Sequence, residues 1–496
     1  MAVGDFEYIP RKPEETVLYR AIAEHLETFL ARQQERERPV PRFVEKEFRT
    51  YLTCGIAEHG FLRLHCDTCG HDRILPFSCK KRSWCPSCGG RRMADTAAHL
   101  VERVFPQVAV RQWVLSLPFQ LRYRMAYDSE LLAEVLNIFV RTVFDELRRR
   151  ARESLGLKQS QCGAVTFVQR FGSSVNLHTH FHTIALDGVY AAGPDGRPQF
   201  HELPPPEDAE VLHVTTRIAG RVLAMIQRRG LEDEADSLGE NDPGLAALYA
   251  AAVRGRIATG SNAGKRVATF GGDRIDGDSL EAMSSPRCAA ASGFNLHANV
   301  DISAGDRDRL ERLLRYAARP ALAIERLSKM SDGRLKYRLK RPWRDGTTDV
   351  LFEPQDFLAK LAALVPAPRV HLTRFHGILA AAAKWRALII PTPVEEHNEQ
   401  PMTLPSSPPD PLSESAKTSV ETEADSAAIA SPRNYTWALL MMRVFALDVL
   451  QCQRCGGRLR ILAAIHPPET TRKILVHLGL PSRAPPLAPP VSECNL

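Results

Sequence analysis

Three histidines alternate with two other residues in the run His178-Thr-His-Phe-His182, and this run constrains the fold more than any other segment. The sequences on its two sides, residues 163–168 and 183–189, are apolar and β-branched with glycine punctuation, which predicts two strands. Residues two apart on a strand share a face, so His180 and His182 should lie side by side, about 7 Å apart at their Cα atoms. The phenylalanine between them should pack in the opposite layer.

Two imidazoles on one strand face can bind a divalent metal ion, because neutral imidazole is a good ligand for such ions. The alternative is a polar strand end whose histidines are hydrogen-bonded and bind nothing. His178 lies on the same face as His180 and His182, and His297 lies on another short predicted strand, residues 294–300. Either His178 or His297 is a candidate third ligand, and either can equally be structural.

Cysteines cluster near the N-terminus, where six of the 11 lie between Cys54 and Cys88. The segments Cys66-Asp-Thr-Cys69-Gly and Cys85-Pro-Ser-Cys88-Gly are CxxC turns, each of which presents two thiolates. Clustered cysteines in a chain without a secretory leader indicate metal binding rather than disulfides. We predict one structural zinc, held by Cys66, Cys69, Cys85 and Cys88. Cys54 and Cys79 would share a second metal or simply pack nearby.

The residues around these cysteines are basic, and no acidic residue occurs between positions 79 and 92. A zinc module with a basic rim is typical of proteins that contact nucleic acid. The alternative is a solvated loop. A net charge of +7 permits a polyanionic partner without requiring one. The candidate DNA-binding residues of this rim are Lys80, Lys81, Arg82, Arg91 and Arg92.

A tyrosine stands apart from the apolar stripe of a helix predicted over residues 306–319. At about 100° per residue, Tyr316 lies well round the helix from that stripe, beside Arg309, Arg312 and Arg319. A core or edge tyrosine is the ordinary alternative. The arginines would favour the phenolate and would hold a phosphate beside it. A tyrosine that attacks a phosphodiester needs this local field, together with a metal that polarises the phosphate.

A strand with one cationic face follows, in a hairpin predicted over residues 334–352. Its basic residues alternate with leucine and tyrosine, so they should share one face. The alternative is a solvated face, but beside a candidate nucleophile we interpret it as a track for backbone phosphates. These candidate DNA-binding residues are Arg334, Lys336, Arg338 and Lys340.

The chain resembles rolling-circle transposases of the HUH (His-hydrophobic-His) superfamily, in the IS91-like group that includes single-tyrosine common-region elements. The resemblance lies in the N-terminal cysteine module and in several further segments. These are Gln112-Trp-Val-Leu-Ser-Leu-Pro118, Asn176-Leu-His-Thr-His-Phe-His182, Arg315-Tyr-Ala-Ala-Arg-Pro320, Tyr337-Arg-Leu-Lys-Arg-Pro-Trp-Arg-Asp-Gly346, His371-Leu-Thr-Arg-Phe-His-Gly377, Tyr435-Thr-Trp-Ala438 and Cys452-Gln-Arg-Cys-Gly456.

This resemblance implies an α+β nuclease domain whose central antiparallel sheet is flanked by helices. It implies that His180 and His182 hold a divalent ion, Mg²⁺ or Mn²⁺, and that Tyr316 forms a 5′-phosphotyrosine link to single-stranded DNA. Two-tyrosine relatives carry a second tyrosine where this chain has Arg312, so strand transfer would need a second subunit, a 3′-hydroxyl attack or repeated use of Tyr316. Other relatives have further histidine ligands in the cysteine module, where this chain has Leu62 and Trp84.

We therefore expect a metal-dependent tyrosine DNA transposase of rolling-circle type, with single-stranded DNA as its partner at the cleavage site and a host helicase as a further candidate. The alternatives are a non-catalytic, zinc-dependent DNA-binding regulator and a metal-dependent nuclease that uses activated water. Residues 260–265 have three residues between their glycines instead of four, and Arg266 follows, so no phosphate loop and no nucleotide cofactor are expected.

The composition along the chain, together with the resemblance to HUH transposases, predicts five parts. These are a helical segment (1–45), a zinc-binding module that contacts DNA (46–105), the HUH nuclease domain (106–390), a disordered linker rich in Pro, Ser, Glu and Thr (391–433) and a small C-terminal unit (434–496). The C-terminal unit contains Cys452 and Cys455, which we interpret as half of a zinc site with no second pair nearby. No apolar run of about 18 residues and no leader is found, so we expect a cytoplasmic protein without a membrane span.

Overall fold

A computed structural model describes residues 11–231, 236–271, 285–343, 345–391 and 436–491. The chain has an α+β fold around a six-stranded antiparallel sheet, ordered β14-β4-β5-β3-β10-β9. Its strands are β3 (Val110–Ser116), β4 (Gly163–Phe171), β5 (Leu177–Leu186), β9 (Cys288–Ala291), β10 (Phe294–Ile302) and β14 (Thr373–Gly377). The predicted fold class and the predicted strands around the histidines are confirmed, because β5 carries the histidine run through the interior of this sheet.

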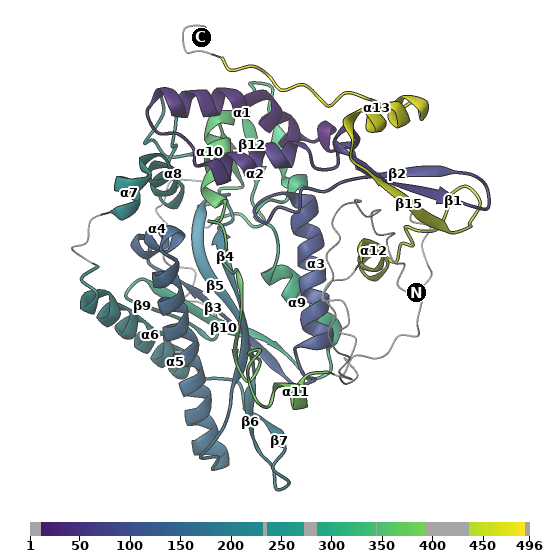
Figure 1. Ribbon diagram of the computed structural model, residues 1–496. Coiled ribbons are helices and arrows are strands. Elements are labelled where there is room, and N and C mark those ends of the chain that lie inside the picture. Colours follow the sequence, from purple (N-terminus) through teal and green to yellow (C-terminus); the bar gives the residue numbers. More distant parts are fainter. Residues whose placement is uncertain (1–10, 232–235, 272–284, 344, 392–435, 492–496) are drawn as a thin grey trace, which may run out of the picture.

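Helices cover both faces of this sheet (Figure 1). They are α3 (Pro86–Arg103), α5 (Ser129–Leu155), α6 (Asp208–Arg228) and α9 (Arg307–Ala317). On one face, Leu115 and Phe181 share a hydrophobic core with residues of α5 and α6. On the other face, Phe167 and Ile184 pack with residues of α3 and α9. The sheet is therefore the middle layer of a three-layer arrangement.

The strand register fixes which layer each histidine faces. His180 pairs with Ser116 on β3 and with Gln169 on β4, so these three side chains share a face. Phe181 points to the opposite face, where it is fully buried and its ring stacks on Phe139 of α5 with centroids 6.2 Å apart. The predicted anchoring of Phe181 in the opposite layer is confirmed. His180 and His182 face the layer that contains α9.

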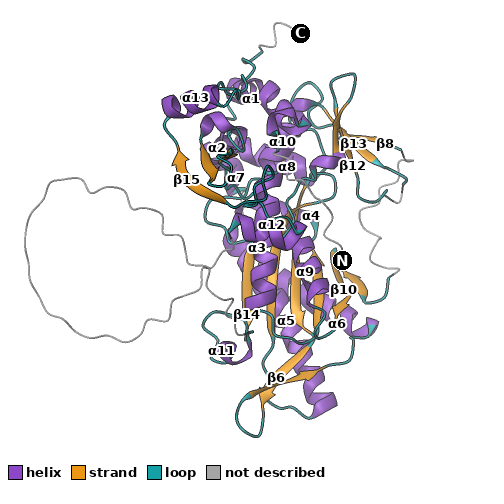
Figure 2. Ribbon diagram, turned by 90° about the vertical axis from the view of Figure 1, so that its right-hand side faces the viewer, coloured by secondary structure: helices purple, strands orange, loops and turns teal. Residues whose placement is uncertain are grey.

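Further helices and a small sheet lie above the main sheet in Figure 2. The helices are α1 (Val17–Glu35), α2 (Arg42–Leu52), α4 (Phe119–Tyr127), α7 (Ser237–Asn241), α8 (Pro243–Val253) and α10 (Pro354–Leu364). The strands, in the order β11-β12-β13-β8, are β11 (Leu327–Lys329), β12 (Leu335–Arg338), β13 (Asp349–Phe352) and β8 (Ala268–Phe270). One hydrophobic core joins α1 and α2 to α10, so the N-terminal helices pack against the segment predicted as the nuclease domain.

The C-terminal segment completes a sheet that begins near the N-terminus (Figure 1). Strand β15 (Leu459–Ile465) pairs with β1 (Phe61–Cys66), which pairs with β2 (Asp72–Pro76). Helices α12 (Trp437–Phe445) and α13 (Pro468–His477) lie on either side of β15 in the sequence. The segment predicted as a small C-terminal unit thus contributes an edge strand to a sheet shared with residues 61–76. Residues 392–435, which include nearly all of the predicted linker, lie outside the described residues.

The remaining elements lie at the lower end of the main sheet in Figure 1. They are the two-stranded sheet of β6 (Gly188–Ala192) and β7 (Pro198–Glu202) and the short helix α11 (Arg386–Ile389).

Candidate active site and cysteine centres

The imidazoles of His180 and His182 converge on one point. Their Nε2 atoms are 3.1 Å apart, and both side chains are buried. Nδ1 of His180 donates a hydrogen bond to the carbonyl of His178 at 2.8 Å, so its Nε2 carries a lone pair that faces Nε2 of His182. Burial lowers the pKa of His180 to about 4 and that of His182 well below its ordinary value. Both rings are therefore neutral near pH 7, which is the form that binds a metal.

Gln112, on the neighbouring strand β3, orients the second imidazole. Its side-chain amide nitrogen lies 2.9 Å from Nδ1 of His182. Turning the amide over, which exchanges its nitrogen and oxygen, would let the oxygen accept a hydrogen bond from Nδ1–H and would leave Nε2 of His182 as a lone pair beside that of His180. A partner on the far nitrogen is the usual support of a metal-binding histidine. The pair thus fits a divalent ion.

Tyr316 is placed beside this pair by the last turn of α9. Its ring centroid lies 5.9 Å from that of His182, edge to face at 79°, and the side chain is 38% exposed. Asp306 caps the helix by accepting a hydrogen bond from the main-chain N–H of Arg309. The helix ends before Pro320, so Tyr316 lies near its C-terminus. Its partial exposure leaves the phenol accessible from solvent.

Two cations lie over the tyrosine ring. The guanidinium of Arg319 is 4.6 Å from the ring centre, and the ammonium of Lys340 is 4.8 Å from it. Lys340 lies two residues after the end of β12 and reaches Tyr316 from a part of the chain other than α9. Arg309 and Arg312, predicted to surround the tyrosine with Arg319, are exposed on α9. Two cations from separate parts of the chain therefore lie over the phenol ring.

The third metal ligand stays a prediction. The His178 ring lies 4.9 Å from that of His180, and its Nε2 atom is buried with no hydrogen-bond partner among the described residues. His297 pairs with Val114, which itself pairs with His182, so His297 shares the face but lies two strands away. Ligand atoms of His, Cys, Asp and Glu can gather to hold a metal ion. Among the described residues, every group of three or more such atoms within 4.8 Å of one another consists of cysteines.

The predicted cationic strand face is present on β12. Leu335, Tyr337 and Leu339 are buried, whereas Lys336 is partly exposed and Arg338 and Lys340 are exposed. Arg334 forms an ion pair of 2.7 Å with Asp332. The basic rim of the cysteine module divides similarly. Lys80 and Arg91 are exposed, Lys81 lies 3.7 Å from Glu47, and Arg82 and Arg92 donate hydrogen bonds to main-chain carbonyls.

The cysteines form two groups, which corrects the predicted zinc site. Cys54, Cys79, Cys85 and Cys88 form one group, and Cys66, Cys69, Cys452 and Cys455 form the other. The prediction that Cys66 and Cys69 share a site with Cys85 and Cys88 was wrong. The turn between β1 and β2 holds the Cys66 pair at the end of the hairpin, next to the C-terminal pair. The assignment of Cys452 and Cys455 as a half-site without a nearby partner was wrong for the same reason.

The first cysteine group has the spacing of a zinc site. The Sγ atom of Cys54 lies 3.7 Å from that of Cys85 and 3.8 Å from that of Cys88, and the Sγ atoms of Cys79 and Cys88 are 3.4 Å apart. Tetrahedral zinc with Zn–S bonds of about 2.3 Å needs sulfurs about 3.8 Å apart, whereas a disulfide needs about 2.0 Å. Trp84 packs beside the group on the ring of Tyr51, at 4.9 Å.

Sequence reasoning missed two glutamines that position the site. Besides Gln112, Gln169 of β4 is buried opposite His180, and its amide donates a hydrogen bond to the carbonyl of Ala317 at 2.7 Å. Each glutamine is a polar residue within a predicted strand, and that is the signal that was available in the sequence. Only the register between strands could turn that signal into a contact.

Two family models match the chain. The model described as "Transposase zinc-binding domain" matches residues 21–117, and the model described as "Putative transposase" matches residues 163–386. The first match covers all of the first cysteine group, and the second covers His180, His182, Tyr316 and Lys340. The chain belongs to the IS91-like transposase family. No curated protein and no solved structure matches this transposase.

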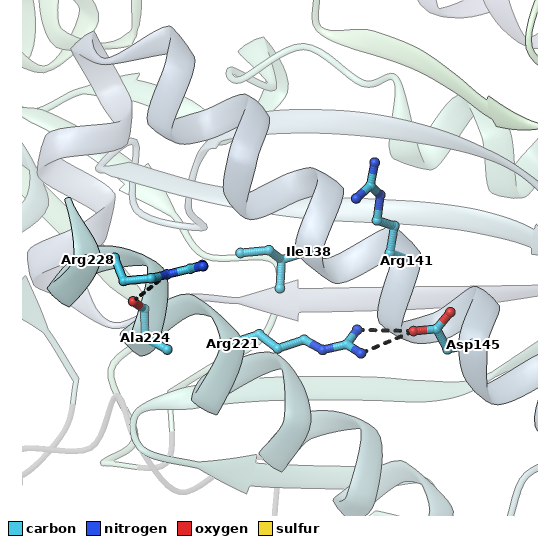
Figure 3. Close-up of a pocket in the computed structure, with 6 residues that line it drawn as sticks. All are labelled: Ile138, Arg141, Asp145, Arg221, Ala224 and Arg228. Atoms are coloured by element: carbon cyan, nitrogen blue, oxygen red, sulfur yellow. Dashed lines mark hydrogen bonds and ion pairs between the residues drawn. The ribbon is translucent and has the colours of Figure 1, made fainter.

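Membership of a transposase family implies that this transposase acts on DNA. A surface cleft of about 640 Å³ lies apart from the histidines, between α5 and α6 (Figure 3). In that cleft the Arg221 guanidinium pairs with Asp145 at 3.2 Å, and Arg228 bonds the carbonyl of Ala224. Its cations are thus largely engaged, and the candidate chemistry lies on the other face of the sheet.

No helix among the described residues has the length and apolar character needed to cross a membrane.

Proposed function

We propose that this transposase cleaves and rejoins single-stranded DNA through a 5′-phosphotyrosine formed on Tyr316, in transposition of rolling-circle type. The observation that supports it most is the 5.9 Å approach of the Tyr316 and His182 rings, with Arg319 and Lys340 over the phenol. A nucleophile, a metal-binding pair and two cations thus meet at one accessible point. That set of groups is what phosphodiester transfer to a hydroxyl requires.

In cleavage, the phenolic oxygen of Tyr316 attacks the scissile phosphorus and forms a new O–P bond. The bond from phosphorus to the 3′-oxygen breaks, the phenol proton passes to solvent, and the leaving oxygen takes a proton from solvent to become a free 3′-hydroxyl. Arg319 and Lys340 stabilise the negative charge on the phosphate oxygens as the transition state forms. Rejoining is the reverse, in which a 3′-hydroxyl attacks the phosphotyrosine and releases Tyr316.

His180 and His182 would hold the divalent ion, Mg²⁺ or Mn²⁺, with His178 or His297 as the candidate third ligand. A divalent ion bound there would polarise the scissile phosphate. The basic rim of the cysteine module and the cationic face of β12 would bind the DNA backbone on either side of the cleavage site. The first cysteine group would hold a structural zinc that supports this rim.

The test is to incubate the full chain with single-stranded oligonucleotides and Mg²⁺ or Mn²⁺, and to look for an adduct that survives denaturation. We expect the adduct with the parent chain and its loss in Tyr316→Phe, which removes the nucleophilic oxygen and keeps the ring. Cleavage without any adduct would instead support a nuclease that uses activated water. Binding without cleavage would support a non-catalytic regulator, for which the histidine pair is structural.

A further inference from the structure

The Cys66 and Cys452 turns have the same main-chain structure, although they lie at opposite ends of the chain. In the first turn, the N–H of Gly70 bonds the carbonyl of Cys66, and in the second the N–H of Gly456 bonds that of Cys452, at 2.9 and 2.8 Å. Both glycines have positive φ, 67° and 75°, which closes each turn tightly. Each turn therefore presents its two sulfurs in the way of a metal-binding knuckle.

The two turns face each other closely enough for one tetrahedral ion. The Sγ atoms of Cys66 and Cys455 are 3.5 Å apart, and those of Cys69 and Cys452 are 3.7 Å apart. All four sulfurs lie within 4.8 Å of one another. These distances match the spacing of about 3.8 Å around zinc and are far too long for disulfides. A side chain at Gly457 would place its Cβ 2.6 Å from the hydroxyl of Thr68, so the turns have approached to contact.

The hydrophobic core beneath these turns is small. Its fully buried members are Leu64, Cys66, Cys452 and Leu459, two of which are themselves cysteines. A three-stranded sheet on so few apolar side chains does not bury enough surface to order itself, and small modules of this kind depend on a metal or a cross-link. Arg460 of β15 and Asp67 of the first turn add only an exposed ion pair of 2.7 Å.

We infer that Cys66, Cys69, Cys452 and Cys455 bind a second structural zinc, which forms a clasp between the N-terminal module and the C-terminal segment. Cys452 and Cys455 lie outside both family matches, so the clasp goes beyond the zinc-binding domain that those matches identify. The clasp also fixes α12, which precedes its second turn. Arg443 of α12 forms an ion pair of 2.7 Å with Glu311 of α9 and contacts Glu102 of α3. The clasp thus steadies the helix that carries Tyr316.

The zinc content of the full chain tests the clasp directly. A background variant, His180→Ala with His182→Ala, removes the histidine pair so that only cysteine sites bind zinc. Native mass spectrometry of this variant should show two zinc ions per chain. Adding Cys452→Ser and Cys455→Ser should lower the count to one, and a parallel change of Cys54 and Cys79 to serine should also lower it to one. A count of one in the background variant, or a count unchanged by the C-terminal serines, would overturn the inference.

A ligand-preserving change covers the case in which the serine variants fail to fold. Cys455 is exposed, so Cys455→His fits sterically and supplies an imidazole, giving a Cys₃His site. This variant should keep two zinc ions per chain, whereas Cys455→Ser should bind the second ion at least tenfold more weakly in competition with a chelator. Equal retention of zinc by both single variants would contradict the clasp. The zinc count does not depend on DNA cleavage, so the proposed function can fail while the clasp holds.

Discussion

The side-chain amide of Gln169 donates a hydrogen bond to the main-chain carbonyl of Ala317, the residue after Tyr316, at 2.7 Å. Gln169 also pairs with His180 across the β4–β5 ladder. One side chain therefore connects the strand of the proposed metal-binding pair, His180 and His182, to the helix that carries the proposed nucleophile, Tyr316. In phosphoryl transfer, the distance between these two groups decides whether the phenol can attack in line.

Replacing Gln169 by leucine should slow covalent adduct formation about 10- to 100-fold, because a displacement of about 1 Å costs that much in a positioned reaction. The affinity for single-stranded DNA should stay unchanged, since Gln169 is buried. Single-turnover adduct assays and fluorescence anisotropy separate the two effects. Gln169→Glu keeps the size but loses the donor when ionised, so a parent-like rate in that variant would contradict this role.

Lys340 and Lys336 are a matched pair for separating catalysis from DNA binding. Lys340 lies 4.8 Å from the Tyr316 ring centre, whereas Lys336 is two residues to the N-terminal side of exposed Arg338 on the same face. Lys340→Gln should lower the rate of adduct formation at saturating DNA by about 100- to 1,000-fold, as the loss of one transition-state contact does. Lys336→Gln should lower only affinity and its salt dependence. Equal rate losses in both variants would remove Lys340 from the catalytic step.

Gln112 should set the affinity of the histidine pair for a divalent ion. Gln112→Leu removes the hydrogen bond to Nδ1 of His182 and should weaken Mn²⁺ binding about 10- to 100-fold, the usual effect of such a partner. Gln112→Glu presents only acceptor oxygens to Nδ1, so it favours the tautomer with the proton on Nδ1 and should bind Mn²⁺ at least as tightly as the parent chain. Calorimetric titration with Mn²⁺ checks both values. Parent-like affinity in the leucine variant would show that the imidazole needs no such support.

His376 of β14 should make the stability of the fold depend on pH. Burial, with a smaller contribution from Arg374, lowers the pKa of His376 to about 4, and its Nε2 has no partner among the described residues. In the unfolded chain the ordinary pKa is about 6.5, so that state takes up the proton first as pH falls. His376 therefore lowers the free energy of unfolding progressively between about pH 6.5 and pH 4, by at most about 3 kcal/mol.

The measurement is denaturant unfolding of the parent chain and of His376→Asn at pH 7.5 and pH 5. The variant should lose less stability on acidification than the parent does, because asparagine does not titrate. Identical losses in the two proteins would assign the acid sensitivity to other groups, of which the buried His178, His180 and His182 are the first.

Local patterns in the sequence predicted the parts of the fold that depend on neighbouring residues. The period of two around His180 gave the strand and the facing of its side chains, and the apolar stripe beside Tyr316 gave the helix and the exposed position of the phenol. Such periodicities report which face is buried, whatever the rest of the chain does. The approach of Tyr316 to His182 was an expectation from function rather than from any spacing.

Contacts between distant segments could not be predicted in this way. Nothing local indicates that Lys340 reaches the Tyr316 ring, or that Gln169 bonds the end of α9. The cysteines show the limit most clearly. Each CxxC turn indicates one pair of ligands for a metal site, but its spacing does not say which other pair completes that site. The pairing of β1 with β15 determines that Cys66 and Cys69 lie beside Cys452 and Cys455.

Because β1 and β15 lie far apart in the sequence, β1 is synthesised long before the strand that pairs with it. Cys66 and its partner Cys455 are 389 residues apart, so at about 5–20 residues per second the ribosome needs roughly 20 to 80 s between them. Throughout that interval the hairpin of β1 and β2 has been synthesised but has one unpaired edge and two thiols without their partners, while the central six-stranded sheet is being translated. A cell that makes this protein must keep those thiols reduced and that edge shielded until the last strand arrives.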